Sequence, residues 1–245
     1  MNQTSGPLYH GSALGWLEHS GFELSTKAYG ENFKPSAYIF IAANKQTAEF
    51  AALNAKNKCL KRKADGILTD TDFIYKNVGY IVQRYLYEVR LLSTAEIIDL
   101  TSKKLPKKQK KRVYHALRSY HKKNKNTANQ TSNKLRYRYW YFDYILQLLR
   151  VYLKNQTWKQ WFDYVLKNYD DLYLHNGELR HYERDGQLAR FCEKANFHGV
   201  KNIERENSTT QPLDEADTVY GLVFFNEFAN KQKWIYEIKL IKTIP

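Results

Sequence analysis

The sequence contains little cysteine and little glycine, and it has no long apolar run. No pair among its 2 cysteines and 7 histidines has the spacing of a metal site, so we expect no bound metal and two reduced thiols. Its 11 glycines form no phosphate-binding loop. No apolar stretch approaches the roughly 18 residues needed to cross a bilayer, and the opening residues lack the basic and apolar regions of a secretory signal. These absences predict a cytoplasmic protein that does not bind membranes.

Acidic residues are missing from one long stretch of the chain. Between Lys103 and Arg138 the sequence has 14 lysines and arginines and no aspartate or glutamate. The other 25 basic residues equal the 25 acidic residues in number, so this stretch carries the whole net charge of +14. A concentrated basic segment on an otherwise neutral chain predicts a polyanionic partner.

The rest of the sequence predicts a mixed fold that is interrupted by a helical insertion. A chain of 245 residues with 43% hydrophobic content is long enough to bury a substantial core. We predict an α+β core formed by residues 1–102 and 185–245, and a basic, aromatic-rich helical insertion at residues 103–184. The expected strands cover residues 7–12, 36–43, 80–92, 218–228 and 233–241, and an Ala-rich helix covers residues 44–57.

Three different short motifs follow one another along the predicted core, and their order helps to identify a related family. They are LYHGS (residues 8–12), AYIFIAANKQTAEFAA (37–52) and VFFNEF (223–228). Each is weak alone, but together they resemble the ADP-ribosyltransferase superfamily, in the branch of the poly(ADP-ribose) polymerases and the bacterial rifampicin ADP-ribosyltransferases. The resemblance covers residues 7–100 and 185–242, and it implies a split β-sheet whose cleft binds NAD. Residues 103–180 resemble no family.

The resemblance implies roles for the residues of the first two motifs. His10 would hydrogen-bond the nicotinamide-side ribose of NAD, and Gly11 would hold the carboxamide through its backbone, because any Cβ there would crowd a flat amide. Tyr38 would pack on the nicotinamide ring. Phe40 lies on the same strand face and is the alternative for that role, while Phe50 would supply a second aromatic ring. Tyr38 and Phe40 could instead both fill the core, which is the interpretation that we favour for Phe40, and Phe50 fits a core role as well as a ligand-binding one.

The third motif contains the glutamate on which the chemistry would depend. By resemblance, Glu227 would hold a ribose hydroxyl and stabilise the cationic sugar as nicotinamide leaves, since a nearby carboxylate stabilises an oxocarbenium-like centre. It could also orient or deprotonate the incoming nucleophile. Glu88 and Glu237 are rival candidates, although both also fit the description of ordinary charges on a strand face.

The basic segment predicts a surface for single-stranded nucleic acid. Cations neutralise phosphates and flat rings stack on unpaired bases, so RNA is the favoured partner. An acidic protein such as an antitoxin would be attracted to the same surface, and a chaperone is a further candidate partner. The interleaved aromatic residues are Tyr114, His115, Tyr120, His121, Tyr137, Tyr139 and Trp140. The candidate contacts are Lys107, Lys108, Lys110, Lys111, Arg112, Arg118, Lys122, Lys123, Arg136 and Arg138.

These features together predict an NAD-dependent mono-ADP-ribosyltransferase that modifies nucleic acid. The resemblance suggests a bacterial toxin or anti-phage effector, with NAD as a substrate and no metal. One alternative is a transferase that modifies a protein side chain. Another is a non-catalytic RNA-binding or scaffold protein with a degenerate fold. An RNA 2′-phosphotransferase of the same superfamily would need paired arginine and histidine near NAD, and the sequence shows no such pairing.

Overall fold

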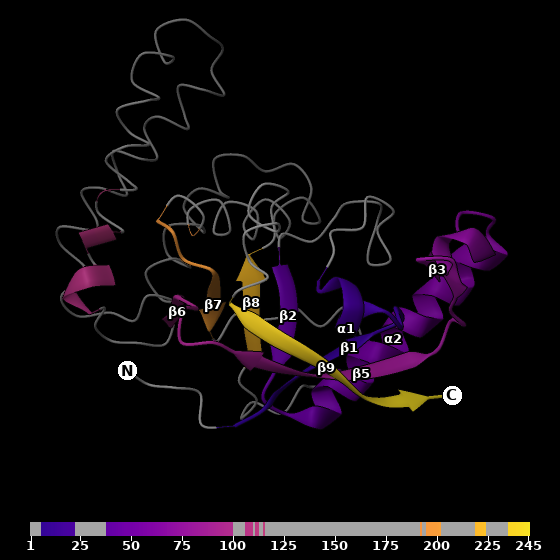
Figure 1. Cartoon of the computed structure of the whole chain (residues 1–245), viewed down its shortest axis with the longest axis horizontal. Helices are drawn as coiled ribbons and strands as arrows, with labels where there is room; N and C mark the ends of the chain where they lie inside the picture. The colour runs from indigo at the N-terminus through magenta and orange to yellow at the C-terminus, as the bar shows by residue number, and fades with distance from the viewer. Residues whose placement is uncertain are drawn as a thin grey trace, which may run out of the picture. The chain divides into compact units, whose positions relative to one another are not determined.

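The structure of the chain is a computed structural model, shown as a cartoon in Figure 1. It divides into two compact units, Met1–Glu96 with Asn202–Pro245, and Ile97–Lys201. In the part of the chain that is described, no helix is both long enough and apolar enough to span a bilayer. The described residues are 6–22, 38–99, 106–109, 111–112, 115, 192, 195–201, 219–223 and 235–245.

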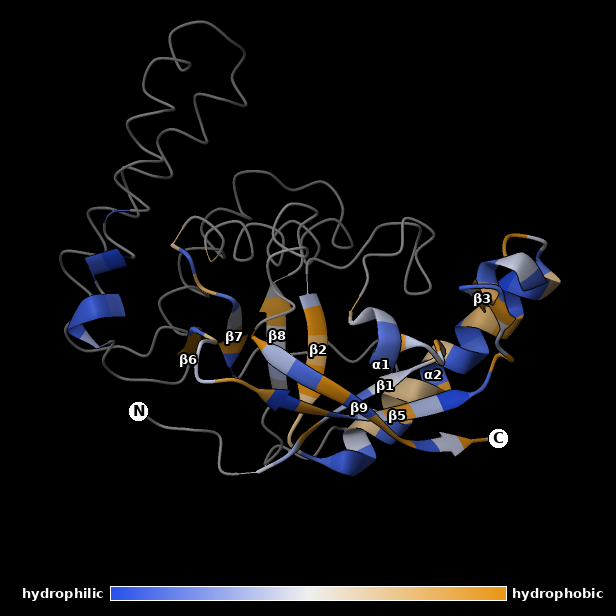
Figure 2. Cartoon of the chain, in the orientation of Figure 1, coloured by the Kyte–Doolittle hydropathy of each residue, from blue (hydrophilic) through white to orange (hydrophobic). Residues whose placement is uncertain are grey.

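The first unit is built around antiparallel strands, as an α+β fold requires. All of its described strand pairings are antiparallel. Its core is apolar, and Figure 2 shows hydrophobic residues along β2 and β8. Leu86, Val89 and Leu222 are completely buried. The strands follow the order β8 (Val219–Val223), β2 (Tyr38–Ala42), β1 (Leu8–Ser12), β5 (Arg84–Leu91) and β9 (Tyr236–Ile244).

The strands β1 and β2 are hydrogen-bonded neighbours in the sheet, but they pair over a shorter length than either does with its other neighbour. β1 pairs with β5 over five residues, and β2 pairs with β8 over five residues. By contrast, β1 and β2 share only the register pair Tyr9–Ala42 among the described residues. Backbone groups on the facing edges of β1 and β2 must therefore find partners outside a regular ladder.

Two helices follow the central strands. α1 (Leu17–Ser20) comes after β1, and α2 (Lys45–Ala64) comes after β2. The Asn44 side chain caps α2 by accepting a 2.8 Å hydrogen bond from the backbone nitrogen of Gln46. Small residues let α2 approach the sheet closely, since Ala48, Ala52 and Cys59 are buried in the contact.

The end of α2 is set by a glycine that the predicted boundary overlooked. The helix runs seven residues beyond the expected end at residue 57 and stops at Ala64. Gly66 then adopts a φ of 70°, and the amides of Gly66 and Ile67 donate to the carbonyls of Lys63 and Arg62. This is the Schellman pattern, which requires a left-handed residue and therefore favours glycine.

Short elements connect α2 to β5. A 3-10 turn, η2 (Asp70–Phe73), leads into a hairpin of β3 (Ile74–Tyr75) and β4 (Val78–Gly79). Lys76 and Asn77 form the tip of the hairpin, and both have positive φ. Neither η2 nor this hairpin was predicted from the sequence.

In the second unit, the described strands pair in parallel. β6 (Ile97–Asp99) lies beside β7 (Gly199–Lys201). The Lys201 ammonium lies 3.5 Å from the Asp99 carboxylate at the end of this pair. The two strands join segments that are about a hundred residues apart in the chain, on either side of the basic stretch.

We expect the protein to lose stability as the solution becomes alkaline. Burial raises the pKa of the Cys59 thiol to about 11 and also raises the pKa of Tyr87 and of Cys192. An exposed thiol in the unfolded chain loses its proton at about pH 8.5, so above that pH the unfolded state binds fewer protons than the folded state. The free energy of unfolding must then decrease with rising pH.

Urea unfolding under reducing conditions at about pH 8 and about pH 10 measures this effect. The decrease between the two should be smaller in Cys59→Ala, because that variant lacks one of the shifted groups. An equal free energy of unfolding at both pH values in the parent protein would show that these groups are not buried.

Candidate active site

His10 lies where β1 and β2 separate. Its Nδ1 is 2.8 Å from the backbone carbonyl oxygen of Phe40. A carbonyl can only accept a hydrogen bond, so Nδ1 must carry the proton. In the neutral ring Nε2 is then the acceptor nitrogen. The side chain thus takes the place of a ladder hydrogen bond, and its tautomer is fixed by the backbone of the neighbouring strand.

Phe22 packs against the His10 ring, and Tyr236 packs against Phe22. Phe22 meets the imidazole edge-on with ring centroids 4.9 Å apart, and Tyr236 lies against Phe22 at 4.7 Å. The backbone amide of Phe22 donates a 2.7 Å hydrogen bond to the Tyr236 hydroxyl. Sequence reasoning missed both residues, because Phe22 and Tyr236 are 214 positions apart and neither belongs to a motif.

Of the two candidate aromatic residues on β2, Phe40 is the one whose backbone carbonyl accepts a hydrogen bond from His10. Tyr38 and Phe40 lie on the same strand face with ring centroids 6.1 Å apart. Tyr38 is almost completely buried, at 1% exposed, whereas Phe40 retains exposed surface. A ring that stacks on a ligand needs an accessible surface, which Phe40 retains and Tyr38 lacks. The register pair Tyr9–Ala42 places both rings on the opposite sheet face from His10, so the contact between Phe40 and His10 is made by the backbone alone.

Gly11 is required for a different reason from the one expected. The side on which a Cβ would project faces α2, where that atom would overlap the Ala48 carbonyl oxygen and lie 2.6 Å from the Ala52 amide nitrogen. Glycine therefore permits α2 to pack closely on β1. We had expected the space beside Gly11 to be filled by the carboxamide of NAD, but α2 fills it. Phe50 lies about 160–200° around α2 from Ala48 and Ala52, so it does not share the helix face that packs against Gly11.

The glutamates fall into two groups. Glu227 lies outside the described residues. Glu88 is paired with Tyr9 and is exposed, and Glu237 is exposed with its carboxylate 4.0 Å from the Arg90 guanidinium. Directly opposed residues share a sheet face and successive residues alternate. His10 opposes Tyr87, so Glu88 and Glu237 both lie on the other face of the sheet from His10.

The described part of the basic segment contains both exposed and engaged side chains. Lys107, Lys108 and Lys111 are exposed, as predicted for contacts with a polyanion. Arg112 differs from that prediction, because its guanidinium is hydrogen-bonded to backbone carbonyls of its own unit. The other candidate contacts, namely Lys110, Arg118, Lys122, Lys123, Arg136 and Arg138, lie outside the described residues.

No protein-family model matches this sequence, and no curated protein and no solved structure matches it either. Within the described ranges, no group of three or more histidine, cysteine, aspartate or glutamate side chains is placed to hold a metal ion. Function is therefore inferred from the chemistry of the His10 site and from the resemblance carried by the three motifs.

Proposed function

We propose that the protein is an NAD-dependent mono-ADP-ribosyltransferase that modifies nucleic acid, with RNA as the favoured acceptor. The observation that carries the proposal is the hydrogen bond from His10 Nδ1 to the Phe40 carbonyl. It joins the first two motifs of the resemblance at the point where the β1–β2 ladder stops. A split sheet with these two motifs at the split is the arrangement that the resemblance implies.

The protonation of His10 suits the role that the resemblance gives it. Because Nδ1 is the donor, Nε2 can accept a hydrogen bond from a ribose hydroxyl of NAD. Phe40, whose backbone carbonyl binds the imidazole and whose side chain is partly exposed, is the aromatic residue that we assign to the nicotinamide ring. Phe22 and Tyr236 would keep the imidazole in place while NAD binds.

The proposed reaction exchanges one bond at the anomeric carbon of NAD for another. The bond from ribose C1′ to the nicotinamide nitrogen breaks, and its electron pair leaves with neutral nicotinamide. An oxygen or nitrogen of the acceptor forms the new bond to C1′ and releases its proton. Glu227 is the residue we assign to stabilising the sugar cation and orienting the acceptor.

Transfer of label from NAD tests this function. Biotinylated NAD is incubated with the protein and a mixture of total RNA, single-stranded DNA and cell protein. We expect label on RNA, and we expect that label to be lost in Glu227→Gln. The matched control is Glu237→Gln, which removes an exposed glutamate on the other sheet face from His10. Label on protein alone would show that the acceptor is a protein and not RNA. No label on any fraction would refute the transferase.

A further inference from the structure

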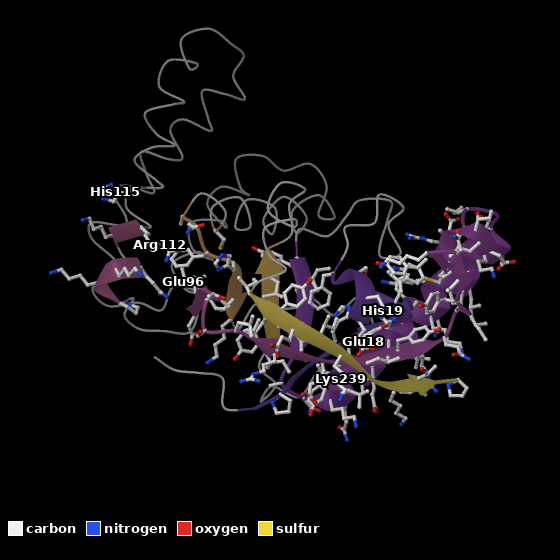
Figure 3. All side chains as sticks on the ribbon, in the orientation of Figure 1. Glu18, His19, Glu96, Arg112, His115 and Lys239 are labelled. Atoms are coloured by element: carbon white, nitrogen blue, oxygen red, sulfur yellow. The ribbon has the colours of Figure 1, made fainter. Side chains whose placement is uncertain are left out.

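The helical residues between Lys107 and His115 include exposed lysines beside side chains that bind the rest of the second unit. Residues 107–109, 111–112 and 115 are helical. Lys107, Lys111 and His115 are spaced by four, so they lie on one side of the helix, with Lys108 next to them. All four are exposed, and Figure 3 labels His115 at the end of this stretch. We call Lys107, Lys108 and Lys111 the lysine face.

Gln109 and Arg112, which lie beside the lysine face on the helix, bind other residues of the second unit. Gln109 Nε2 donates to the Ile97 carbonyl of β6 at 3.4 Å. Arg112 Nε donates to the Ala195 carbonyl at 2.9 Å, and its terminal nitrogen donates to the Asn196 carbonyl. The Arg112 guanidinium also covers the ring of Phe197 at 4.4 Å from the centroid.

These contacts depend on the shape of a guanidinium group. Ala195 and Asn196 form a turn after the helical residue Cys192, where the Phe197 amide donates back to the Cys192 carbonyl. A planar guanidinium can bind two carbonyls while stacking on an aromatic ring, which a lysine ammonium cannot do. Phe197 is completely buried, so this attachment is part of the core of the second unit.

We infer that Lys107, Lys108 and Lys111 contact the phosphates of a single-stranded nucleic acid, and that Arg112 is the positioning residue that holds this lysine face outward. The inference rests on the proposed function for the choice of nucleic acid over an acidic protein. Two observations support it. The lysine face is exposed, and Arg112 binds backbone carbonyls of the same unit. The lysine face also lies within the segment that carries the whole excess of positive charge and no acidic residue.

The salt dependence of RNA binding tests the lysine face. A fluorescently labelled single-stranded RNA is titrated with the full-length protein at several salt concentrations, without NAD. In a variant with Lys107→Gln, Lys108→Gln and Lys111→Gln, the slope of log K against log salt should fall by about 2, because each phosphate contact on a single strand contributes about 0.7. The matched control carries Lys61→Gln, Lys239→Gln and Lys242→Gln, three exposed lysines of the first unit, and should keep the parent slope.

Conservative and non-conservative changes at Arg112 separate positioning from direct contact. If Arg112 positions the lysine face, both Arg112→Lys and Arg112→Gln should reduce the salt slope. Each reduction should exceed about 0.7, which is the contribution of a single phosphate contact. A residue that contacts phosphate would instead retain the parent slope in Arg112→Lys. Circular dichroism confirms that each variant is folded, and the lysine-face variant stays informative if the Arg112 variants unfold.

The possible outcomes distinguish this inference from the proposed function. An unchanged slope in the lysine-face variant, with RNA still bound by the parent, would overturn the inference and leave the transferase intact. A parent protein that transfers label to protein and binds no RNA would overturn both the lysine face and the nucleic-acid acceptor. A reduced slope together with no NAD-dependent label would support the RNA surface and refute the transferase.

Discussion

Replacing Gly11 with alanine is expected to prevent the first unit from folding stably. The added Cβ would overlap the Ala48 carbonyl oxygen and lie 2.6 Å from the Ala52 amide nitrogen. Both neighbours are backbone atoms of a 20-residue helix, so no side chain can rotate away to make room. Ordinary overpacking of a core costs about 1–3 kcal/mol, and we expect a larger loss here because α2 must move away from β1.

Thermal unfolding followed by circular dichroism measures this loss. Gly79→Ala is the matched control, because an added Cβ at Gly79 would meet no atom within 4 Å. Its free energy of unfolding should stay within about 0.5 kcal/mol of the parent value. A Gly11→Ala protein that melts within a few degrees of the parent would contradict the packing of α2 on β1. Gly11→Ala should not be used to test NAD binding, since its effect on folding would dominate.

Replacing His10 with asparagine is expected to reduce transferase activity about 100-fold while leaving the fold intact. The side-chain amide of asparagine can take the position of Nδ1–H and donate to the Phe40 carbonyl, which preserves the contact seen at 2.8 Å. It offers no group at the position of Nε2. Leaving a buried polar group of the substrate without its partner costs about 1–3 kcal/mol. Each 1.4 kcal/mol is a factor of ten, so a 100-fold loss lies at the upper end of this range.

Two further variants make the interpretation of His10→Asn unambiguous. His10→Ala removes both nitrogens and leaves the Phe40 carbonyl without its imidazole donor, so it should lose both activity and about 1–3 kcal/mol of stability. His19→Asn changes an exposed histidine of α1, labelled in Figure 3, and should retain parent activity. Activity is measured as kcat/KM for label transfer from NAD. Parent activity in His10→Asn would show that Nε2 has no role.

The strands that carry the site could be predicted from the sequence, but their contacts could not. Aromatic and β-branched residues around His10 and Phe40 correctly predicted β1 and β2. The contact between His10 and Phe40 could be expected only from the resemblance, because strand pairing depends on residues that are far apart in the sequence. The Ala-rich composition predicted α2, while its true end depended on Gly66, a local signal that was present and overlooked.

Residues whose partners are remote in sequence were assigned less well. Gly11 was expected to make room for a ligand, because the sequence does not show which element crosses the strand at that point. Arg112 could not be distinguished from the other basic residues around it, since Ala195, Asn196 and Phe197 are more than eighty positions away. In both cases the residue type indicated a specific requirement at that position, but only the structure shows which neighbouring residues impose it.

Calorimetric titration of NAD into the purified protein tests the His10 site most directly, because it needs neither an acceptor nor turnover. The proposed site predicts that the parent protein and His19→Asn bind NAD with equal affinity, and that His10→Asn, folded and equally stable, binds it much more weakly. Equal NAD affinity in His10→Asn and the parent, or no NAD binding by the folded parent protein, would contradict the assignment of this site.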